Sequence, residues 1–298
     1  MSDVRVPERS SAVVQDRLPC WCGGRWSEVL RTARFGVLRC ADCGTHRIDP
    51  PAIHSDGESK DFYTDYYQGD GGARRTANLS LRAAQLWPVF ERAPELQHPG
   101  ALAIELGCGD GHLCARLKHA GWKSVIGFEI SASRAARARK LYPELDIRPG
   151  LPRDYDLQEG CADLVIMEAV IEHIADPVDA LAETANLLSP EGRLILTTPN
   201  IGSGDFRFLK GRWTGMLAPH AHLFLFDRES MRRMLRAAGM EPLDVGSFPA
   251  PFLLPNTLRL REWRNLKSCL WRMHQDLGAL YGRWLGEGAM LYAVAARV

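Results

Sequence analysis

Residues 103 to 111 read Ala-Ile-Glu-Leu-Gly-Cys-Gly-Asp-Gly, so that a short apolar run precedes three glycines at alternate positions. This pattern is typical of a β-strand that runs into a nucleotide-binding turn. Glycine lacks a Cβ, which allows the backbone to adopt positive φ and to approach a ligand closely, and a helix that begins near His112 would point free N–H groups at that ligand. The turn therefore predicts a binding site, formed by Gly107, Gly109 and Gly111.

A second apolar run supports the same interpretation. It extends from Ser124 to Phe128 and ends in Glu129. In this fold class, an acid about twenty residues past the glycine turn binds the diol of a ribose. A dinucleotide site would satisfy the same geometry, but its fingerprint is G-x-G-x-x-G and requires no acid ahead of the turn.

The spacing E-x-G-x-G-x-G, which begins at Glu105, resembles motif I of the class I S-adenosylmethionine (SAM) methyltransferases. The chemistry agrees, because SAM has no pyrophosphate but has a cationic methionyl half, which an acidic strand end suits. Residues 162–173 (ADLVIMEAVIEH) look like the fourth strand of that family and its "EH" segment, and residues 188–200 (LSPEGRLILTTPN) look like the turn into strand five. These blocks come in the family's order, and the resemblance covers roughly residues 75 to 298.

The resemblance implies an α/β fold, a Rossmann-like, doubly wound, seven-stranded sheet with an antiparallel last strand. The chain's own periodicity agrees, because apolar runs alternate with amphipathic stretches, which predicts parallel strands joined by helices. We expect strands at 101–106, 124–129, 145–148, 163–167 and 193–198, helices at 111–119, 132–141, 177–187 and 228–238, and a final strand at 290–298.

The bulk composition is that of a globular protein with one α/β domain and a smaller appendage. The chain has 298 residues, of which 46% are hydrophobic, and a formal net charge of +1, which supplies no general attraction to nucleic acid or membrane. No apolar run approaches the roughly eighteen residues of a membrane span, and the first residues lack the apolar core of a signal peptide, so we expect a cytoplasmic protein. Local basic clusters are interpreted as solvated helix faces, the first at Arg134, Arg137, Arg139 and Lys140.

Four of the eight cysteines form two pairs near the start of the chain, Cys20 with Cys22 and Cys40 with Cys43. Two thiolate pairs separated by a hairpin's length of chain are the ligand pattern of a zinc ribbon, in which a structural zinc has four protein ligands and no open position for catalysis. The first pair is one residue shorter than the usual knuckle. A site that uses His46 or His54, and the absence of a metal, therefore stay open as alternatives. The remaining cysteines are interpreted as buried apolar residues.

The domain organisation follows from these motifs. We expect a loose arm at 1–18, a zinc-ribbon-like module at 19–52 and a lid with a covering helix at 53–92. The methyltransferase domain would occupy 93–298, with a core separate from that of the ribbon. It would include an aromatic substrate loop at 201–222 and a helical insert at 255–286.

The resemblance also assigns cofactor-binding roles. The three glycines would admit the methionyl and ribosyl part of SAM, Glu105 would orient its ammonium group, and Glu129 would accept hydrogen bonds from both ribose hydroxyls. Ile130 would pack on adenine, and Glu168 would face the methionyl end of the site. Many relatives carry an acid after strand three that binds the adenine amine, but residues 148–151 (RPGL) offer none.

The candidates for the acceptor side are less specific. Tyr66 lies where related small-molecule methyltransferases place a lid, and it would contact the SAM carboxylate or cover the sulfonium; packing within the lid is the alternative. His173 matches the "EH" position, and His220 and His222 lie in the aromatic loop. Each is a candidate general base, and each alternatively holds its turn by hydrogen bonds. The spacing of His220 and His222 also permits a metal, but no third ligand is evident from the sequence.

These observations favour a SAM-dependent methyltransferase that acts on a small molecule, by O-methylation of a sugar, glycoside or secondary metabolite. N-methylation of an amino sugar is the nearest variant. An RNA methyltransferase that grips RNA with its zinc module is the competing class, and the near-zero net charge argues against it. A SAM-binding fold retained only for assembly is a third reading, disfavoured by the intact glycines. The sequence does not fix the oligomeric state, and a homodimer is compatible with it.

Overall fold

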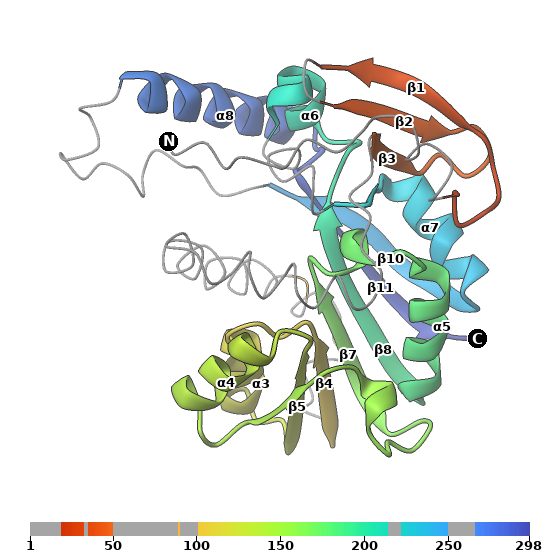
Figure 1. The fold of residues 1–298 in the computed structure, drawn as a ribbon, viewed down its shortest axis with the longest axis vertical. Coiled ribbons are helices and arrows are strands. Elements are labelled where there is room, and N and C mark those ends of the chain that lie inside the picture. Colours follow the sequence, from red (N-terminus) through yellow and green to blue (C-terminus); the bar gives the residue numbers. More distant parts are fainter. Residues whose placement is uncertain (1–18, 33–34, 50–88, 90–100, 214–221, 250–265) are drawn as a thin grey trace, which may run out of the picture.

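The computed structural model describes residues 19–32, 35–49, 89, 101–213, 222–249 and 266–298 (Figure 1). Several predicted features lie outside these residues. They are the N-terminal arm, His54, most of the lid and covering helix with Tyr66, His220, and the start of the helical insert.

Seven strands form the main sheet, in the order β10-β11-β8-β7-β4-β5-β6. Neighbouring strands from β6 to β8 are parallel, whereas β11 is antiparallel to both β8 and β10. The predicted Rossmann-like sheet with an antiparallel last strand is thereby confirmed. The strands are β4 (Leu102–Leu106), β5 (Ser124–Glu129), β6 (Asp146–Pro149), β7 (Ala162–Glu168), β8 (Leu188–Pro199), β10 (Met240–Phe248) and β11 (Met290–Arg297).

Helices cover both faces of this sheet, with α3 and α4 on one side and α5 and α7 on the other (Figure 1). The strands supply both cores because successive side chains point to opposite faces. In β4, Ala103 packs with the α3 and α4 side, and Ile104 packs with the α5 and α7 side. The helices are α3 (His112–His119), α4 (Ala132–Leu141), α5 (Pro177–Leu187) and α7 (Arg228–Ala237), with short 3-10 turns η2 (Pro152–Asp154) and η3 (Ile171–His173).

The cysteine-bearing segment forms a second sheet, which is completed by a strand from far downstream. Its order is β1 (Trp26–Arg31), β2 (Gly36–Cys40), β3 (His46–Asp49) and β9 (Phe224–Leu225). In the register of β3 with β9, His46 pairs with Leu225 and Arg47 with Phe224. Side chains of the two segments also share one buried cluster, in which Val37 and Ile48 pack with Trp213 and Leu225. The expectation of separate cores is therefore wrong.

The predicted aromatic loop at 201–222 is in part helical. Residues 204–212 form α6 (Gly204–Leu209) and the 3-10 turn η4 (Lys210–Arg212). Phe206 and the fully buried Trp213 pack into the cluster that they share with residues of β2 and β3. These aromatic side chains therefore hold the second sheet onto the rest of the molecule.

Near the C-terminus, α8 (Leu266–Trp284) packs against α6 and leads into β11. It lies at the margin of the molecule, away from the seven-stranded sheet (Figure 1). None of the helices in the described part of the chain is both long and apolar enough to cross a membrane.

Candidate cofactor and acceptor site

The glycine turn follows β4 as the sequence predicts. Gly107, Gly109 and Gly111 have φ of 72°, 57° and 78°, a left-handed region that favours glycine. The N–H groups of Gly107 and Cys108 both donate to the carbonyl of Phe128, at 2.8 and 2.9 Å, which ties the turn to the end of β5. A Cβ on Gly107 would lie 2.6 Å from Cγ2 of Val170, so a larger residue would push the turn away from the end of β7.

Glu129, the last residue of β5, is buried and forms hydrogen bonds that hold this turn. Its Oε2 accepts the N–H of Gly109 at 2.8 Å, and its Oε1 accepts the N–H of Ser131 at 2.9 Å. Because an ionised carboxylate offers about four acceptor positions, these two bonds fix its orientation and leave capacity for two more. The clasp holds the carboxylate at the carboxyl end of the parallel strands, where ligands bind in this fold class.

Arg134 is part of the same cluster, which the sequence analysis missed. Its side chain is only 13% exposed, and it lies 3.9 Å from Glu129 and 4.0 Å from Asp110. The guanidinium also lies where a Cβ on Gly109 would be. Its interpretation as a solvated helix face is therefore wrong, whereas Arg137, Arg139 and Lys140 are exposed as expected.

Glu105 is buried at the end of β4, where it accepts a hydrogen bond from the Cys114 thiol at 2.9 Å. Its pKa is raised to about 8, chiefly by burial and in smaller part by the nearby charges of Glu168 and Glu129, while the hydrogen bond from Cys114 opposes the shift. Glu168 ends β7 and is half-buried, and the next residue, Ala169, has φ of 51°, a strained value for a residue with a Cβ. Three carboxyl groups thus surround the glycine turn, an arrangement that suits a cationic ligand.

A carboxyl group that the sequence analysis did not identify lies at the end of β6, which corresponds to strand three of the family. Asp154 of η2 folds back so that its Oδ2 accepts the N–H of Leu151 at 2.8 Å and lies against Gly150. The N–H of Gly150 in turn donates to the carbonyl of Glu129 at 2.9 Å. Ile130, predicted to pack on adenine, is half-buried beside this turn. The 3-10 turn thus brings a carboxyl group that stands three residues after RPGL back to the end of β6.

On the other side of β7, the structure brings Glu172, His173 and His222 together. The rings of His173 and His222 lie 4.9 Å apart, and Nε2 of His173 lies 3.9 Å from Oε1 of Glu172. Glu172 is buried, and its Oε2 accepts the hydroxyl of Thr198 at 3.0 Å. One ligand atom from each of the three lies within 4.8 Å of the others. Glu172 thus supplies a third metal-ligand candidate beside His222, which the sequence analysis did not find.

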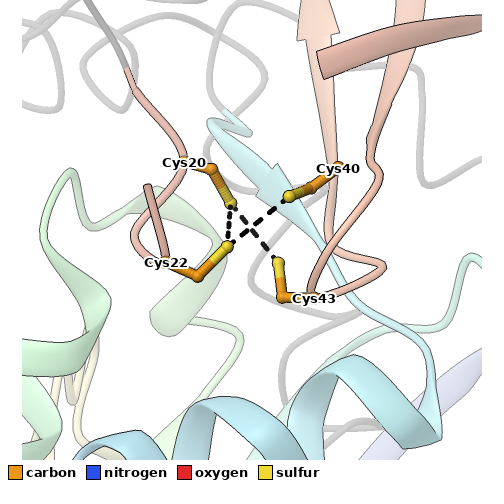
Figure 2. Close-up of side chains that lie close together, drawn as sticks. All are labelled: Cys20, Cys22, Cys40 and Cys43. Atoms are coloured by element: carbon orange, nitrogen blue, oxygen red, sulfur yellow. Dashed lines mark hydrogen bonds between the residues drawn. The ribbon is translucent and has the colours of Figure 1, made fainter. Parts of the chain in front are cut away.

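The four N-terminal cysteines converge on one point (Figure 2). Sγ of Cys20 lies 3.4 Å from that of Cys43, and Sγ of Cys22 lies 3.5 Å from those of Cys20 and Cys40. All four are free thiols, and the distances are close to the about 3.8 Å between sulfurs of a tetrahedron with 2.3 Å zinc–sulfur bonds. The hydrogen bond with Cys43, together with burial, raises the pKa of Cys20, and the same bond lowers the pKa of Cys43 to about 5. Donor type and spacing therefore fit zinc, and His46 is not part of the group.

A family described as a methyltransferase domain matches residues 79–245, which is more than half of the chain. The chain belongs to this methyltransferase family. The prediction of a class I SAM-dependent methyltransferase from motif I is thereby confirmed.

Individual relatives agree with the family. The methyltransferase is 29% identical over 146 residues to a probable SAM-dependent methyltransferase of Mycolicibacterium smegmatis, a match that covers 49% of this chain and 54% of that protein. It is 29% identical over 181 residues to a ubiquinone biosynthesis O-methyltransferase of Cereibacter sphaeroides, covering 56% and 71%. The chain spans about half, or less, of the length of the first curated relatives that it matches.

A solved structure confirms the fold independently. The structure of geranyl diphosphate methyltransferase in complex with SAM aligns with a TM-score of 0.52 and 20% sequence identity, and the alignment covers 77% of this chain and 92% of that one. At that identity the likeness concerns the fold, and the site must be argued from this chain's own residues.

Proposed function

We propose that this methyltransferase binds SAM at the glycine turn and transfers the methyl group to a small molecule, by O-methylation of a sugar, glycoside or secondary metabolite. The observation that carries the proposal is the clasp of Glu129 on Gly109 and Ser131, which presents a pre-oriented carboxylate at the end of β5. A pre-oriented acceptor binds a diol without reorganising first. The O-methyltransferase among the relatives supports an acceptor hydroxyl.

SAM, when bound, supplies an electrophilic methyl group on a sulfonium. The residues of this chain would hold it as follows. Glu129 would accept both ribose hydroxyls with its remaining acceptor positions, and Gly107, Gly109 and Gly111 would let the backbone approach. Glu105 and Glu168 would face the methionyl ammonium, Ile130 would cover adenine, and Asp154 would accept a hydrogen bond from the adenine amine. Tyr66 of the predicted lid would close the site.

The acceptor would be activated by the cluster of Glu172, His173 and His222. A hydroxyl must lose its proton as the methyl arrives, and a histidine is the natural base near neutral pH. The buried carboxylate of Glu172, held by Thr198, lies beside His173 and would help to position its ring. His220 stays a third candidate base from the sequence.

A structural zinc at the four cysteines forms part of the same proposal. Its ligand set is complete without solvent, so the metal would hold the turn before β1 to the turn after β2 and take no part in methyl transfer. Its effect on the active site would be through the strands that it fixes.

Cofactor binding can be tested by calorimetric titration with SAM and its demethylated product. Glu129→Gln replaces a charged acceptor by an amide, and bonds to charged groups contribute about 1.5–3 kcal/mol each, so we expect affinity to fall about tenfold or more. Glu183→Gln, on an exposed helix position paired with Arg153, is the matched control and should bind as the parent does. Unchanged affinity in a folded Glu129→Gln protein would remove Glu129 from the site.

The base is tested by turnover against pH in alanine variants of His173, His220 and His222. Loss of the true base should lower turnover by about a hundredfold or more, while SAM affinity is retained. The remaining turnover should no longer depend on a group that titrates in the ordinary range of histidine. His119→Ala, at an exposed end of α3, is the control.

Other outcomes of that experiment point elsewhere. If every variant stays within a few-fold of the parent, the acceptor is an amine, as in an amino sugar, and positioning carries the reaction. Activity lost to a chelator while the zinc content and Tm are unchanged, and restored by a divalent cation, would assign the cluster to a metal. Retention of bulk RNA in a filter-binding assay would favour the RNA methyltransferase alternative.

A further inference from the structure

The guanidinium group of Arg134 lies between two buried carboxylates at the glycine turn. Its Nη1 is 3.9 Å from Oε2 of Glu129, and its Nε is 4.0 Å from Oδ1 of Asp110. Asp110 and Glu129 are each only 4% exposed, and the Arg134 side chain is 13% exposed. Because charges interact more strongly where water is largely excluded, this cation attracts the two carboxylates more than it would at the surface.

The glycine turn itself makes room for this guanidinium group. Gly109 has φ of 57°, and a Cβ on it would collide with Nη2 of Arg134, so the group occupies space that only a glycine leaves open. The N–H of Gly109 donates to Oε2 of Glu129, which is the oxygen that Arg134 approaches. The turn, the carboxylate and the guanidinium group therefore meet at one point.

Other residues hold α4 in place without this charge. The Ser131 hydroxyl caps the first turn of the helix, and Ala138 is fully buried in the core on this face of the main sheet. Arg139 donates to the carbonyl of Ile147 in β6 at 2.8 Å. The helix thus has a cap, an apolar face and a hydrogen bond to the sheet that do not involve Arg134, which favours a role for that charge at the turn.

Arg134 also offsets a concentration of negative charge. The carboxyl groups of Glu168 and Glu129 lie close enough to Glu105 for their charges to raise its pKa. Asp110 adds a further buried carboxylate on the other side of Gly109. Because like charges repel, a Glu129 carboxylate without a nearby cation would be driven away from the turn and toward water.

We propose that Arg134 is a positioning residue of the cofactor site, whose charge holds the carboxylate of Glu129 in the orientation that accepts the ribose hydroxyls. The inference rests on the proposed role of Glu129 in SAM binding. At 3.9 Å the contact of Arg134 with Glu129 is longer than a hydrogen bond, so it supplies charge and leaves the remaining acceptor positions of the carboxylate to the ligand. A residue that bonded those positions directly would compete with the ribose.

The rival interpretation is that Arg134 serves only to neutralise Asp110. Arg137, which lies one turn further along α4, separates the two interpretations. Its Nη2 is 3.6 Å from Oδ2 of Asp110, and its side chain is 46% exposed. Arg137→Gln therefore removes a cation from Asp110 and keeps the pair of Arg134 with Glu129, which makes it the matched control.

The test is calorimetric titration of the full chain with S-adenosylhomocysteine, which carries the ribose but no sulfonium charge. Arg134→Gln and Arg134→Met both remove the cation, and we expect each to weaken binding by about tenfold. Arg134→Lys restores a charge and should recover most of that affinity, whereas Arg137→Gln should bind as the parent does. Circular dichroism and Tm identify the folded variants, and either charge-free variant is sufficient if the other does not fold.

A double-mutant cycle distinguishes positioning from structural support. In a Glu129→Gln background, Arg134→Gln should weaken binding by less than about twofold, because no carboxylate remains to be held. The ligand offers the same comparison. The 2′-deoxy analogue of S-adenosylhomocysteine should bind the parent more weakly than the ribose form does, and this difference should shrink in Arg134→Gln.

Three results would overturn the inference. Folded charge-free variants of Arg134 could bind within about twofold of the parent while Glu129→Gln binds weakly, which would leave the proposed function standing. The loss caused by Arg134→Gln could be equal in both backgrounds, which would make Arg134 a structural support of the turn. Arg137→Gln could lose as much affinity as Arg134→Gln, which would assign the effect to Asp110. Parent-like binding by Glu129→Gln would instead contradict the proposed function, and this inference with it.

Discussion

At the scale of single residues, the carboxyl group of Glu105 gives the site its most specific physical signature. Its pKa of about 8 is well above the ordinary value because the side chain is buried beside two other carboxyl groups. The group is therefore mostly protonated at neutral pH in the folded chain. In the unfolded chain it is ionised there.

This difference predicts a pH dependence of stability. Between the ordinary carboxyl pKa and about 8, the folded state binds more protons than the unfolded state, so the free energy of unfolding falls as pH rises through that window and is flat above it. We expect the Tm of the parent to fall between pH 6 and 8.5, and Glu105→Gln to lack that part of the decrease. Thermal melts of both proteins against pH, with Glu183→Gln as the exposed control, measure it. Parallel curves for parent and Glu105→Gln would contradict the raised pKa.

The same group should respond to the cofactor. A cationic ammonium beside it would lower the pKa of Glu105 again, so SAM binding at pH 7 should release a proton. Calorimetry in two buffers of different ionisation enthalpy would detect this as a difference in apparent heat. The difference should disappear in Glu105→Gln.

The role of a residue could be predicted from the sequence where its partners lie close to it along the chain. Glu129 was placed because a strand end and a glycine turn fix its position by spacing alone. Arg134 was missed because its partner Asp110 lies 24 positions earlier and meets it only after α4 docks. The pairing of His173 with His222 likewise needs the chain to return along β9.

At the scale of elements, the contact between α6 and α8 depends on the absence of side chains at its glycines. A Cβ on Gly282 would collide with the carboxylate of Asp205 and lie 2.8 Å from the carbonyl of Glu287. Helix propensity alone would make Gly282→Ala stabilising by about 1 kcal/mol. We expect the opposite sign, a loss of about 1–3 kcal/mol, because overpacking separates the helices. Chemical denaturation gives the sign directly, and a stabilised variant would show that α8 can shift away from α6.

Elements with strong end signals were predicted with the observed bounds. In α4 the Ser131 hydroxyl accepts the N–H of Arg134, and in α5 Asp176 caps the helix ahead of Pro177. The start of each helix is therefore determined by residues next to it in the sequence. The edge strand β10 was not predicted. It carries Pro242 at an irregularity in its register and Gly246, residues that weaken a strand pattern and that only an edge position tolerates. The sequence predicted a loop where the short α6 forms, because the positions of its aromatic residues are set by packing against the second sheet.

At the scale of the whole molecule, the second sheet and the methyltransferase fold share one core, so we expect them to unfold together. Their shared cluster joins Val37 and Ile48 to Trp213, and Arg233 of α7 donates to the carbonyl of Asp42 at 2.6 Å. Local damage at the cysteines should therefore be felt beyond β1 to β3.

We predict one zinc per chain, and a loss of global stability when it is removed. Zinc binding contributes about 10–16 kcal/mol to folding in zinc-finger peptides, and each kcal/mol moves Tm by about 2–4 °C in a domain of this size, so Cys40→Ser should lower Tm by about 20 °C or more. The transition should stay single, since the cores are shared. Cys161→Ser, at a half-buried cysteine outside the cluster, is the control. Metal content of zero in protein purified without chelator, or a separate early transition, would contradict this view.

The pairing of β3 with β9 also has a consequence for how the protein is made. During synthesis the first three strands of the second sheet emerge early, but their partner at Phe224 and Leu225 follows only after most of the remaining chain. At the ribosomal rate of about 5–20 residues per second, the nascent β3 edge waits about ten seconds or more with its N–H and C=O groups unpaired. An open edge is a template for pairing with other chains. Zinc bound by the nascent cysteines would order the hairpins but would not close that edge, so expression yield should depend on temperature and chaperones even when zinc is plentiful.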